Sequence, residues 1–190
     1  AGTQIFLGMK WATMLLDPSY NPVVKSLTVV PEGSSAYTQP EVDKAFENRP
    51  GSYTDIETLK TIVLMTDGEN SSTQRISSRY YANDSHYVHW SKYNLNWYLY
   101  NYVNSWDRKS FYWQKYDKWR GDQLLADMCS AAKAKHIVIW SVGFEVTDDG
   151  AEVMKECASS SSHFFRVEGV KLSEAFSAIA SQINQLRLTQ

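Results

Sequence analysis

The chain has 190 residues, of which 43% are hydrophobic and 21% charged, as expected for one globular domain with its own core. Its 19 basic and 21 acidic side chains give a net charge of −2, so no overall field would attract nucleic acid or an anionic membrane surface. No apolar run approaches the roughly 20 residues of a membrane span, and no signal peptide opens the sequence. We therefore expect any membrane anchor to lie outside this chain.

The first segment predicts a helix that is apolar on more than one side. One apolar set recurs at helical spacing: Ile5, Met9, Ala12 and Leu16. A second set widens the stripe: Leu7, Trp11 and Met14. Thr3 falls at the natural N-cap, and Asp17-Pro18 ends the pattern. Such a helix belongs between a sheet and something else.

Residues 20–59 read as a long connection, because proline, serine, glycine and asparagine interrupt the apolar pattern. Within it, residues 23–30 could form a short strand. Beyond it, residues 62–65 form an apolar run that stops on Asp67-Gly68, which predicts a parallel strand buried on both faces. Asp67 then lies at the carboxyl end of that strand, where open parallel sheets bind ligands. The alternative is that Asp-Gly only makes a turn.

Residues 74–122 are rich in aromatic and basic side chains. Fifteen aromatic residues lie between Tyr80 and Trp119, and the segment holds eight basic and four acidic side chains. Four aromatic residues fit one helical stripe and are candidates for contacting a partner: Trp90, Tyr93, Trp97 and Tyr100. Basic charge among aromatics can bind single-stranded nucleic acid or sugars. We favour a subdomain with its own small core that contacts a protein, since Tyr and Trp dominate protein contact surfaces.

The rest of the chain alternates helix and strand. Asp122 is expected to cap a helix, residues 137–142 to form a buried strand, and Asp148-Asp149 to open a second helix. Residues 163–167 predict a third strand, and Ser173 is placed as the cap of the last helix. This alternation predicts an α/β fold, with a doubly wound and mostly parallel sheet flanked by helices and right-handed crossovers.

The chain has two cysteines, Cys129 and Cys157, on the helices before and after the strand at 137–142. Two right-handed crossovers that step the same way place those helices side by side on one face of the sheet. An oxidising compartment would then favour a disulfide between them. The alternative is a pair of buried free thiols.

Three motifs resemble the von Willebrand factor A (vWA) domain: Gly2-Thr3-Gln4-Ile5, Val63-Leu64-Met65-Thr66-Asp67-Gly68-Glu69-Asn70 and Ile139-Trp140-Ser141-Val142-Gly143-Phe144. The closing segment, with Cys157-Ala158-Ser159-Ser160 and Phe164-Phe165, is similar to the TadG-like proteins of tight-adherence (Flp) pilus assembly. The resemblance implies that residues 1–190 are a single partial vWA-like domain. It also implies that the first strands are missing at the N-terminus and that residues 74–122 are an insertion.

The family resemblance implies a site for a divalent cation, usually Mg²⁺. Such a site is built from a D-x-S-x-S loop, a threonine before a helix and the aspartate of the TDG strand. Thr3 and Asp67 match the second and third elements, whereas no D-x-S-x-S sequence occurs in the chain. We therefore expect a remnant site that binds Mg²⁺ weakly or not at all.

A catalytic function is an alternative to a binding function. A haloacid-dehalogenase-type phosphatase also places Asp-Gly after a strand, but its nucleophilic aspartate would stand where this chain has Met65. The expectation is a non-enzymatic adhesion module in the periplasm or cell envelope, with a protein partner and no nucleic acid. Carbohydrate binding through the insertion is the alternative, and a metal-dependent hydrolase is a more remote one.

Self-association is also expected. If the first strands are missing, the strand at 62–65 has an unpaired apolar edge that can recruit a second copy. The alternative is that residues 23–30 fold back and cover this edge.

Overall fold

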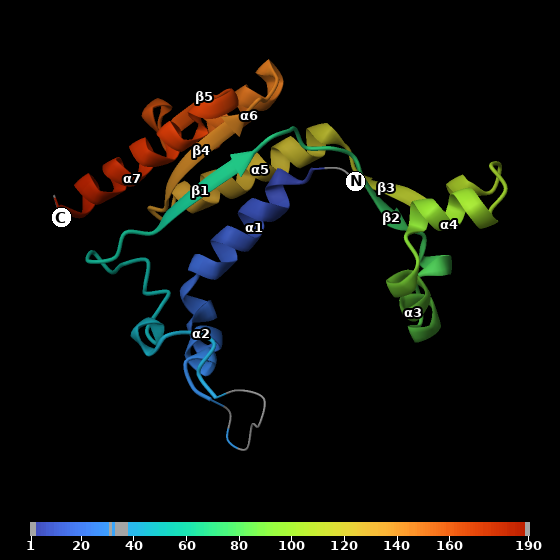
Figure 1. Cartoon of the computed structure of the whole chain (residues 1–190), viewed down its shortest axis with the longest axis horizontal. Coiled ribbons are helices and arrows are strands. Elements are labelled where there is room, and N and C mark those ends of the chain that lie inside the picture. The colour runs from blue at the N-terminus through green and yellow to red at the C-terminus, as the bar shows by residue number, and fades with distance from the viewer. Residues whose placement is uncertain (1–2, 31, 33–37, 189–190) are drawn as a thin grey trace.

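The computed structural model describes residues 3–30, 32 and 38–188, with the side chains up to residue 185, and its centre is a three-stranded parallel sheet (Figure 1). The strands are β1 (Thr61–Thr66), β4 (Val138–Phe144) and β5 (Phe164–Val167), in the order β1-β4-β5. All three run parallel, with Leu64 opposite Ser141 and Ser141 opposite Phe164. The expected α/β class with a parallel sheet is confirmed.

Helices cover both faces of this sheet. On one face lie α1 (Ile5–Leu16), α5 (Lys118–Lys133) and α6 (Asp148–Cys157). Together with β1 and β4 they bury the larger core: Ile5, Phe6, Met9, Ile62, Leu64, Leu125, Cys129, Ala132, Ile137, Ile139, Met154 and Cys157. On the other face, α7 (Leu172–Leu188) packs on β4 and β5. There it encloses a second core: Trp140, Val142, Val167, Ala175 and Ile179.

The first strand is not buried on both faces, so that expectation is wrong. Ile62 and Leu64 point into the larger core, whereas Val63 and Met65 on the opposite face are 41% and 46% exposed. Successive side chains of a strand point to opposite faces, and α7 packs over β4 and β5 on that second face. Within the described residues β1 is also an edge strand, since it pairs with β4 alone. One face and one edge of β1 therefore face solvent.

The segment after α1 also differs from the sequence reading. The short helices η1 (Pro18–Tyr20), α2 (Asn21–Leu27) and η2 (Lys44–Phe46) form here, so the strand proposed for residues 23–30 is wrong. Pro22 lies in the first turn of α2, where its missing N–H is no loss. A proline at this position favours a helix, although the valines that follow are β-branched. The described part of this segment therefore adds no strand to the free edge of β1.

A buried lysine fixes where α1 ends and β1 begins. The helix stops at Leu16, as predicted, and the Lys60 Nζ donates to the carbonyl oxygens of Leu16 and Gly51, each at 2.6 Å. The same ammonium lies 4.3 Å from the centre of the Tyr53 ring. Lys60 is buried, and desolvation lowers the pKa of its ammonium group. Its hydrogen bonds join the end of α1, the loop at Gly51 and the residue before β1.

The aromatic segment forms an arm that projects away from the parallel sheet (Figure 1). Its base is the antiparallel pair β2 (Thr73–Ile76) and β3 (Tyr112–Tyr116). Between them lie η3 (Ser78–Tyr80), α3 (Asp84–Lys92), α4 (Leu95–Tyr102) and η4 (Arg108–Phe111). We call residues 73–116 the aromatic arm. A T-shaped contact between Tyr116 and Phe6 packs its base against α1.

Two helix starts differ from the sequence prediction by a few residues. The α5 helix begins at Lys118, capped by the Asp117 side chain, so Asp122 lies inside the helix and is not its cap. The α7 helix already includes Leu172, so Ser173 is not its cap either. The short helices η5 (Ser161–His163) and η6 (Gly169–Lys171) flank β5. The start of α6 is as expected, since Asp148 and Asp149 form its first turn after Thr147.

Candidate functional site

The two candidate metal ligands lie on neighbouring segments at the carboxyl end of β1. A Cβ added at Gly68, next to Asp67, would lie 3.6 Å from the Thr3 hydroxyl oxygen. Both Thr3 and Asp67 are exposed. Thr3 does not cap α1, contrary to the sequence reading, because the N-cap position belongs to Gln4, which makes no side-chain capping bond. The edge of the sheet thus brings the start of α1 to the turn after β1.

Asn70 caps α1 from another part of the chain. Its Oδ1 accepts a hydrogen bond from the Ile5 amide at 2.8 Å, and its Nδ2 donates to Asp122 Oδ1 at 2.8 Å. Asn70 is only 2% exposed. Gly121 makes room for it, since a Cβ at that position would lie 3.0 Å from the Asn70 Cβ. The start of α1, the turn after β1 and the first turns of α5 are therefore joined through one amide side chain.

Ser71 adds a second connection between the same two segments. Its amide donates to the Thr3 carbonyl oxygen at 2.9 Å, and its hydroxyl oxygen accepts from the Thr3 amide at 3.2 Å. The Gln4 Nε2 donates to the Ser71 carbonyl oxygen at 2.5 Å. Thr3 is thus positioned by its backbone, which leaves its hydroxyl beside the Gly68 turn.

Most acidic side chains at this edge are paired with basic ones. Lys118 lies 2.5 Å from Glu69 and 3.4 Å from Asp149, and the hydrogen bond to Glu69 raises the pKa of the lysine. Glu69 also accepts a hydrogen bond from the Thr147 hydroxyl. The Arg166 guanidinium of β5 contacts Asp148 in the first turn of α6 at 2.7 Å. Among the described residues no basic group lies within 4.0 Å of Asp67.

This arrangement does not by itself make a Mg²⁺ site. Mg²⁺ requires near-octahedral coordination by oxygen atoms. Thr3 and Asp67 offer one hydroxyl and one carboxylate. Across residues 3–30, 32 and 38–188, no group of three or more His, Cys, Asp or Glu side chains is placed to hold a metal ion. The family's cation site therefore fits these residues only in part, and no step of a mechanism is assigned to a metal.

We expect Mg²⁺ to bind this chain with a dissociation constant weaker than about 10⁻³ M, because one carboxylate supplies too little charge to dehydrate the ion. Isothermal titration calorimetry with MgCl₂ measures this directly. Asp67→Ala serves as the matched variant and should give the same featureless titration. Micromolar binding by the wild-type chain that disappears in Asp67→Ala would contradict the expectation.

The four candidate partner residues do not share one helical stripe. Trp90 lies in α3, whereas Trp97 and Tyr100 lie in α4, and Asn94 caps α4 by accepting from the Trp97 amide. Trp90 is partly buried, and its indole N–H donates to the Tyr80 carbonyl oxygen at 2.7 Å. It belongs to the small core of the arm, together with the buried Leu99 and the rings packed around it.

The other three candidates are exposed. Tyr93 and Trp97 stack with ring centroids 6.0 Å apart, and Tyr100 is 75% exposed. Sequence periodicity missed five further exposed aromatic side chains of the arm: Tyr81, Tyr87, Tyr102, Trp106 and Trp113. The exposure of Trp106 could have been predicted from its neighbours in the sequence. Asn104, Ser105 and Asp107 are polar, so they offer the tryptophan no apolar contact along the chain.

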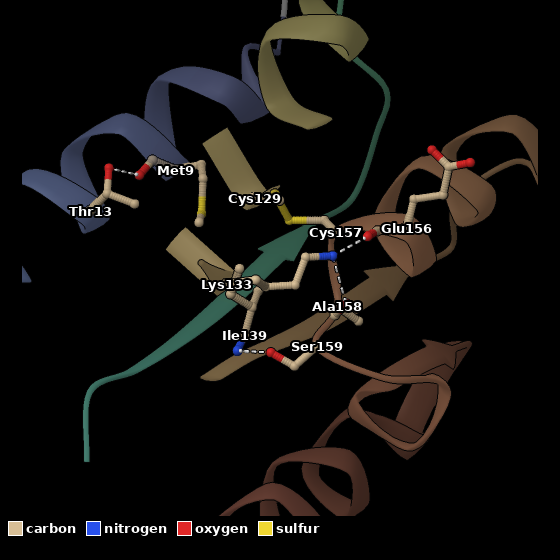
Figure 2. Close-up of a disulfide and its surroundings, with 9 residues drawn as sticks. All are labelled: Met9, Thr13, Cys129, Lys133, Ile139, Glu156, Cys157, Ala158 and Ser159. Carbon is tan, nitrogen blue, oxygen red and sulfur yellow. Dashed lines mark hydrogen bonds between the residues drawn. A yellow bond between two sulfur atoms is a disulfide. The ribbon is translucent and has the colours of Figure 1, made fainter. Parts of the chain in front are cut away.

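The two cysteines lie where the crossover argument placed them. Cys129 of α5 and Cys157 of α6 are joined in the structure with Cα atoms 5.2 Å apart, and Met9 of α1 points toward the pair (Figure 2). Both cysteines are buried. Hydrogen bonds also connect α5 to the end of α6, since the Lys133 Nζ donates to the carbonyl oxygens of Glu156 and Ala158 at 2.9 and 3.3 Å. The geometry therefore suits a disulfide between adjacent helices.

Comparisons with known proteins find no match: no family model, no curated protein and no solved structure corresponds to this chain. The vWA and TadG-like resemblance thus rests on the sequence motifs alone. In the part of the chain that the structure describes, none of the helices has both the length and the apolar composition of a membrane span.

Proposed function

We propose that this chain is a non-catalytic binding module of a bacterial cell-envelope protein: a vWA-like domain of the TadG-like type, with a role in assembling or anchoring Flp (Tad) pili. The ordered motifs support this proposal. So does the parallel sheet with helices on both faces, since it is compatible with a vWA architecture. The position of the Thr3 hydroxyl beside the Asp67-Gly68 turn agrees with a remnant of the family's adhesion site.

The exposed aromatic side chains of the arm are the main observation in support of a binding function. It exposes eight large aromatic side chains: Tyr81, Tyr87, Tyr93, Trp97, Tyr100, Tyr102, Trp106 and Trp113. Soluble proteins seldom expose so many aromatic side chains on one small subdomain without a partner. Because Tyr and Trp have large rigid surfaces, they supply most of the energy at protein contacts. The arm is held by its own core and by β2 and β3, so it presents these rings on a folded support.

The proposed location is the periplasm or the cell envelope, with a membrane anchor outside this chain. The support is the pair Cys129–Cys157, whose geometry suits a disulfide in an oxidising compartment. The proposed partner is a protein of the pilus or envelope, and a second copy of the chain is a further candidate.

Binding of a purified Flp pilin subunit to the immobilised chain tests the proposal. We expect Trp97→Ala combined with Tyr100→Ala to weaken that binding by about a hundredfold or more, because central aromatic contacts of this kind contribute about 2 kcal/mol each and are not fully additive. Trp119→Ala is the matched control, since Trp119 is exposed on α5 outside the arm. Biolayer interferometry gives the affinities. Pilin binding that the double variant leaves unchanged, or no pilin binding at all, removes the proposed role.

Carbohydrate binding is the second candidate, and one cleft favours it. A cleft of about 610 Å³ lies between the start of α1 and the arm. Its lining is almost entirely uncharged and polar: Gln4, Ser71, Ser72, Thr73, Gln74, Asn94, Leu95 and Asn96. Two buried oxygen atoms there, Gln4 Oε1 and Thr73 Oγ1, have no hydrogen-bond partner. Amides and hydroxyls without charge suit a neutral sugar. A glycan array that detects binding lost in Asn96→Ala would favour this function over protein adhesion.

A further inference from the structure

The aromatic arm ends in a loop that presents one tryptophan almost completely to solvent. Trp106 is 93% exposed in the turn between α4 and η4. This turn lies at the end of the arm far from the parallel sheet (Figure 1). Tyr100 and Tyr102, at the end of α4, are also exposed. We call residues 100–109 the arm tip. Three exposed aromatic rings within ten residues of one protruding tip mark a contact surface.

The arm tip is held in shape by Arg108. Its Nε donates to the Val103 carbonyl oxygen at 3.1 Å, and its Nη2 donates to the Tyr100 carbonyl oxygen at 3.2 Å. The guanidinium carbon lies 5.4 Å from the centre of the Tyr100 ring. The Asp107 amide closes the turn by donating to the Asn104 carbonyl oxygen at 3.0 Å. Trp106 is therefore presented on a loop with a defined conformation.

Charge in this molecule is divided between the arm and the rest. Residues 73–116 hold six basic and two acidic side chains, a net charge of +4, whereas the whole chain carries −2. The remainder is therefore acidic, at −6. In the described structure no ion pair involves any of the six arm cations. They are Arg75, Arg79, Lys92, Arg108, Lys109 and Lys115. The arm is thus the positive end of an otherwise negative molecule.

We propose that the arm tip docks on the surface of an anionic lipid bilayer. Trp and Tyr rings favour the boundary between headgroups and acyl chains, because one end of each ring system is apolar and the other is polar. Trp106 enters this boundary, while Lys109 in the arm tip meets anionic headgroups. The acidic remainder of the chain is held away from the membrane, which orients the arm toward it. A long nucleic acid is less suitable, because it would extend past the arm onto acidic surface.

Co-flotation with unilamellar vesicles tests this proposal without any protein partner, so its result is independent of the pilus role. We expect the wild-type chain to float with vesicles of phosphatidylcholine and phosphatidylglycerol and to do so less at high salt. Trp106→Ser should weaken binding by about tenfold, which corresponds to the burial of part of one large apolar side chain. Lys109→Gln should weaken it by about fivefold, the effect of one basic side chain at an anionic surface.

Two control variants match these changes outside the arm tip. Trp119→Ser removes an exposed tryptophan of α5, and Lys10→Gln removes an exposed lysine of α1. Both should bind vesicles as the wild type does, and circular dichroism checks that every variant is folded. The proposal is overturned if the chain ignores anionic vesicles, if Trp106→Ser binds them unchanged, or if pure phosphatidylcholine binds equally well. Loss of pilin binding in Trp106→Ser without any vesicle binding would assign the tip to a protein partner.

Discussion

Reduction of the Cys129–Cys157 bridge lowers the free energy of unfolding by about 3–4 kcal/mol, which is the loop-entropy value for a bridge of this length. The two cysteines are 28 residues apart in sequence and close the loop that contains β4. Urea denaturation of the purified chain, with and without reductant, measures the difference. Because most single domains are stable by only about 5–15 kcal/mol, a change of this size moves the transition midpoint visibly.

The variant Cys129→Ala combined with Cys157→Ala provides the control for this measurement. Its stability should not respond to reductant, whereas the wild-type value should fall. Because Lys133 also donates hydrogen bonds to the end of α6, we expect the two helices to stay adjacent when the covalent bond is absent. If non-reducing mass spectrometry finds both wild-type thiols open to alkylation after unfolding, the disulfide is absent. The argument for an oxidising compartment then loses its support.

Sedimentation of this chain at increasing concentration is expected to show a rising apparent mass. The side of α1 that faces away from the sheet exposes three large apolar side chains: Leu7, Trp11 and Leu15. Complete burial of one such side chain is worth about 1.5–3 kcal/mol, so leaving the set in water is costly. Gly8 lies between Leu7 and Trp11 with no atom near its open side, so a second helix can approach there closely. Association of two copies covers this surface.

Trp11→Glu should shift the chain toward the monomer, because it places a charge in the centre of that apolar side of α1. Trp106→Glu is the matched control, since Trp106 is more exposed than Trp11 and lies in the arm tip. It should leave the association unchanged. A wild-type chain that sediments as a monomer at every concentration would show that this surface tolerates water.

The parallel sheet could be predicted because its strands are short apolar runs that end in turns. Residues 62–65 and 137–142 carry this pattern, and the structure places strands over both. An apolar run does not report which helices cover it, so the exposed face of β1 could not be seen in the sequence. Residues 23–30 were misread because β-branched side chains favour a strand locally, while Pro22 starts a helix just before them.

For the candidate site, the sequence predicted only that its residues lie at the ends of strands. The ends of parallel strands meet at one edge, and this brings Asp67-Gly68 to Thr3. The contact of Asn70 with Ile5 spans 65 positions, and no local pattern signals it. In the arm, the spacing of Trp90 and Trp97 suggested one helix, but the capping bond from Asn94 separates two. Side-chain hydrogen bonds decided these details.

The position of Asn70 has a consequence for the opening of the molecule. The amide proton of Ile5 is held by a side chain beyond β1, and that same side chain is held by α5. Local fraying of the first helical turn therefore requires the Asn70 contacts to break as well. Hydrogen exchange at Ile5 should accordingly follow the opening of α5 and the end of β1. Helix α1 is therefore expected to open late, as part of one cooperative unit with α5 and the end of β1.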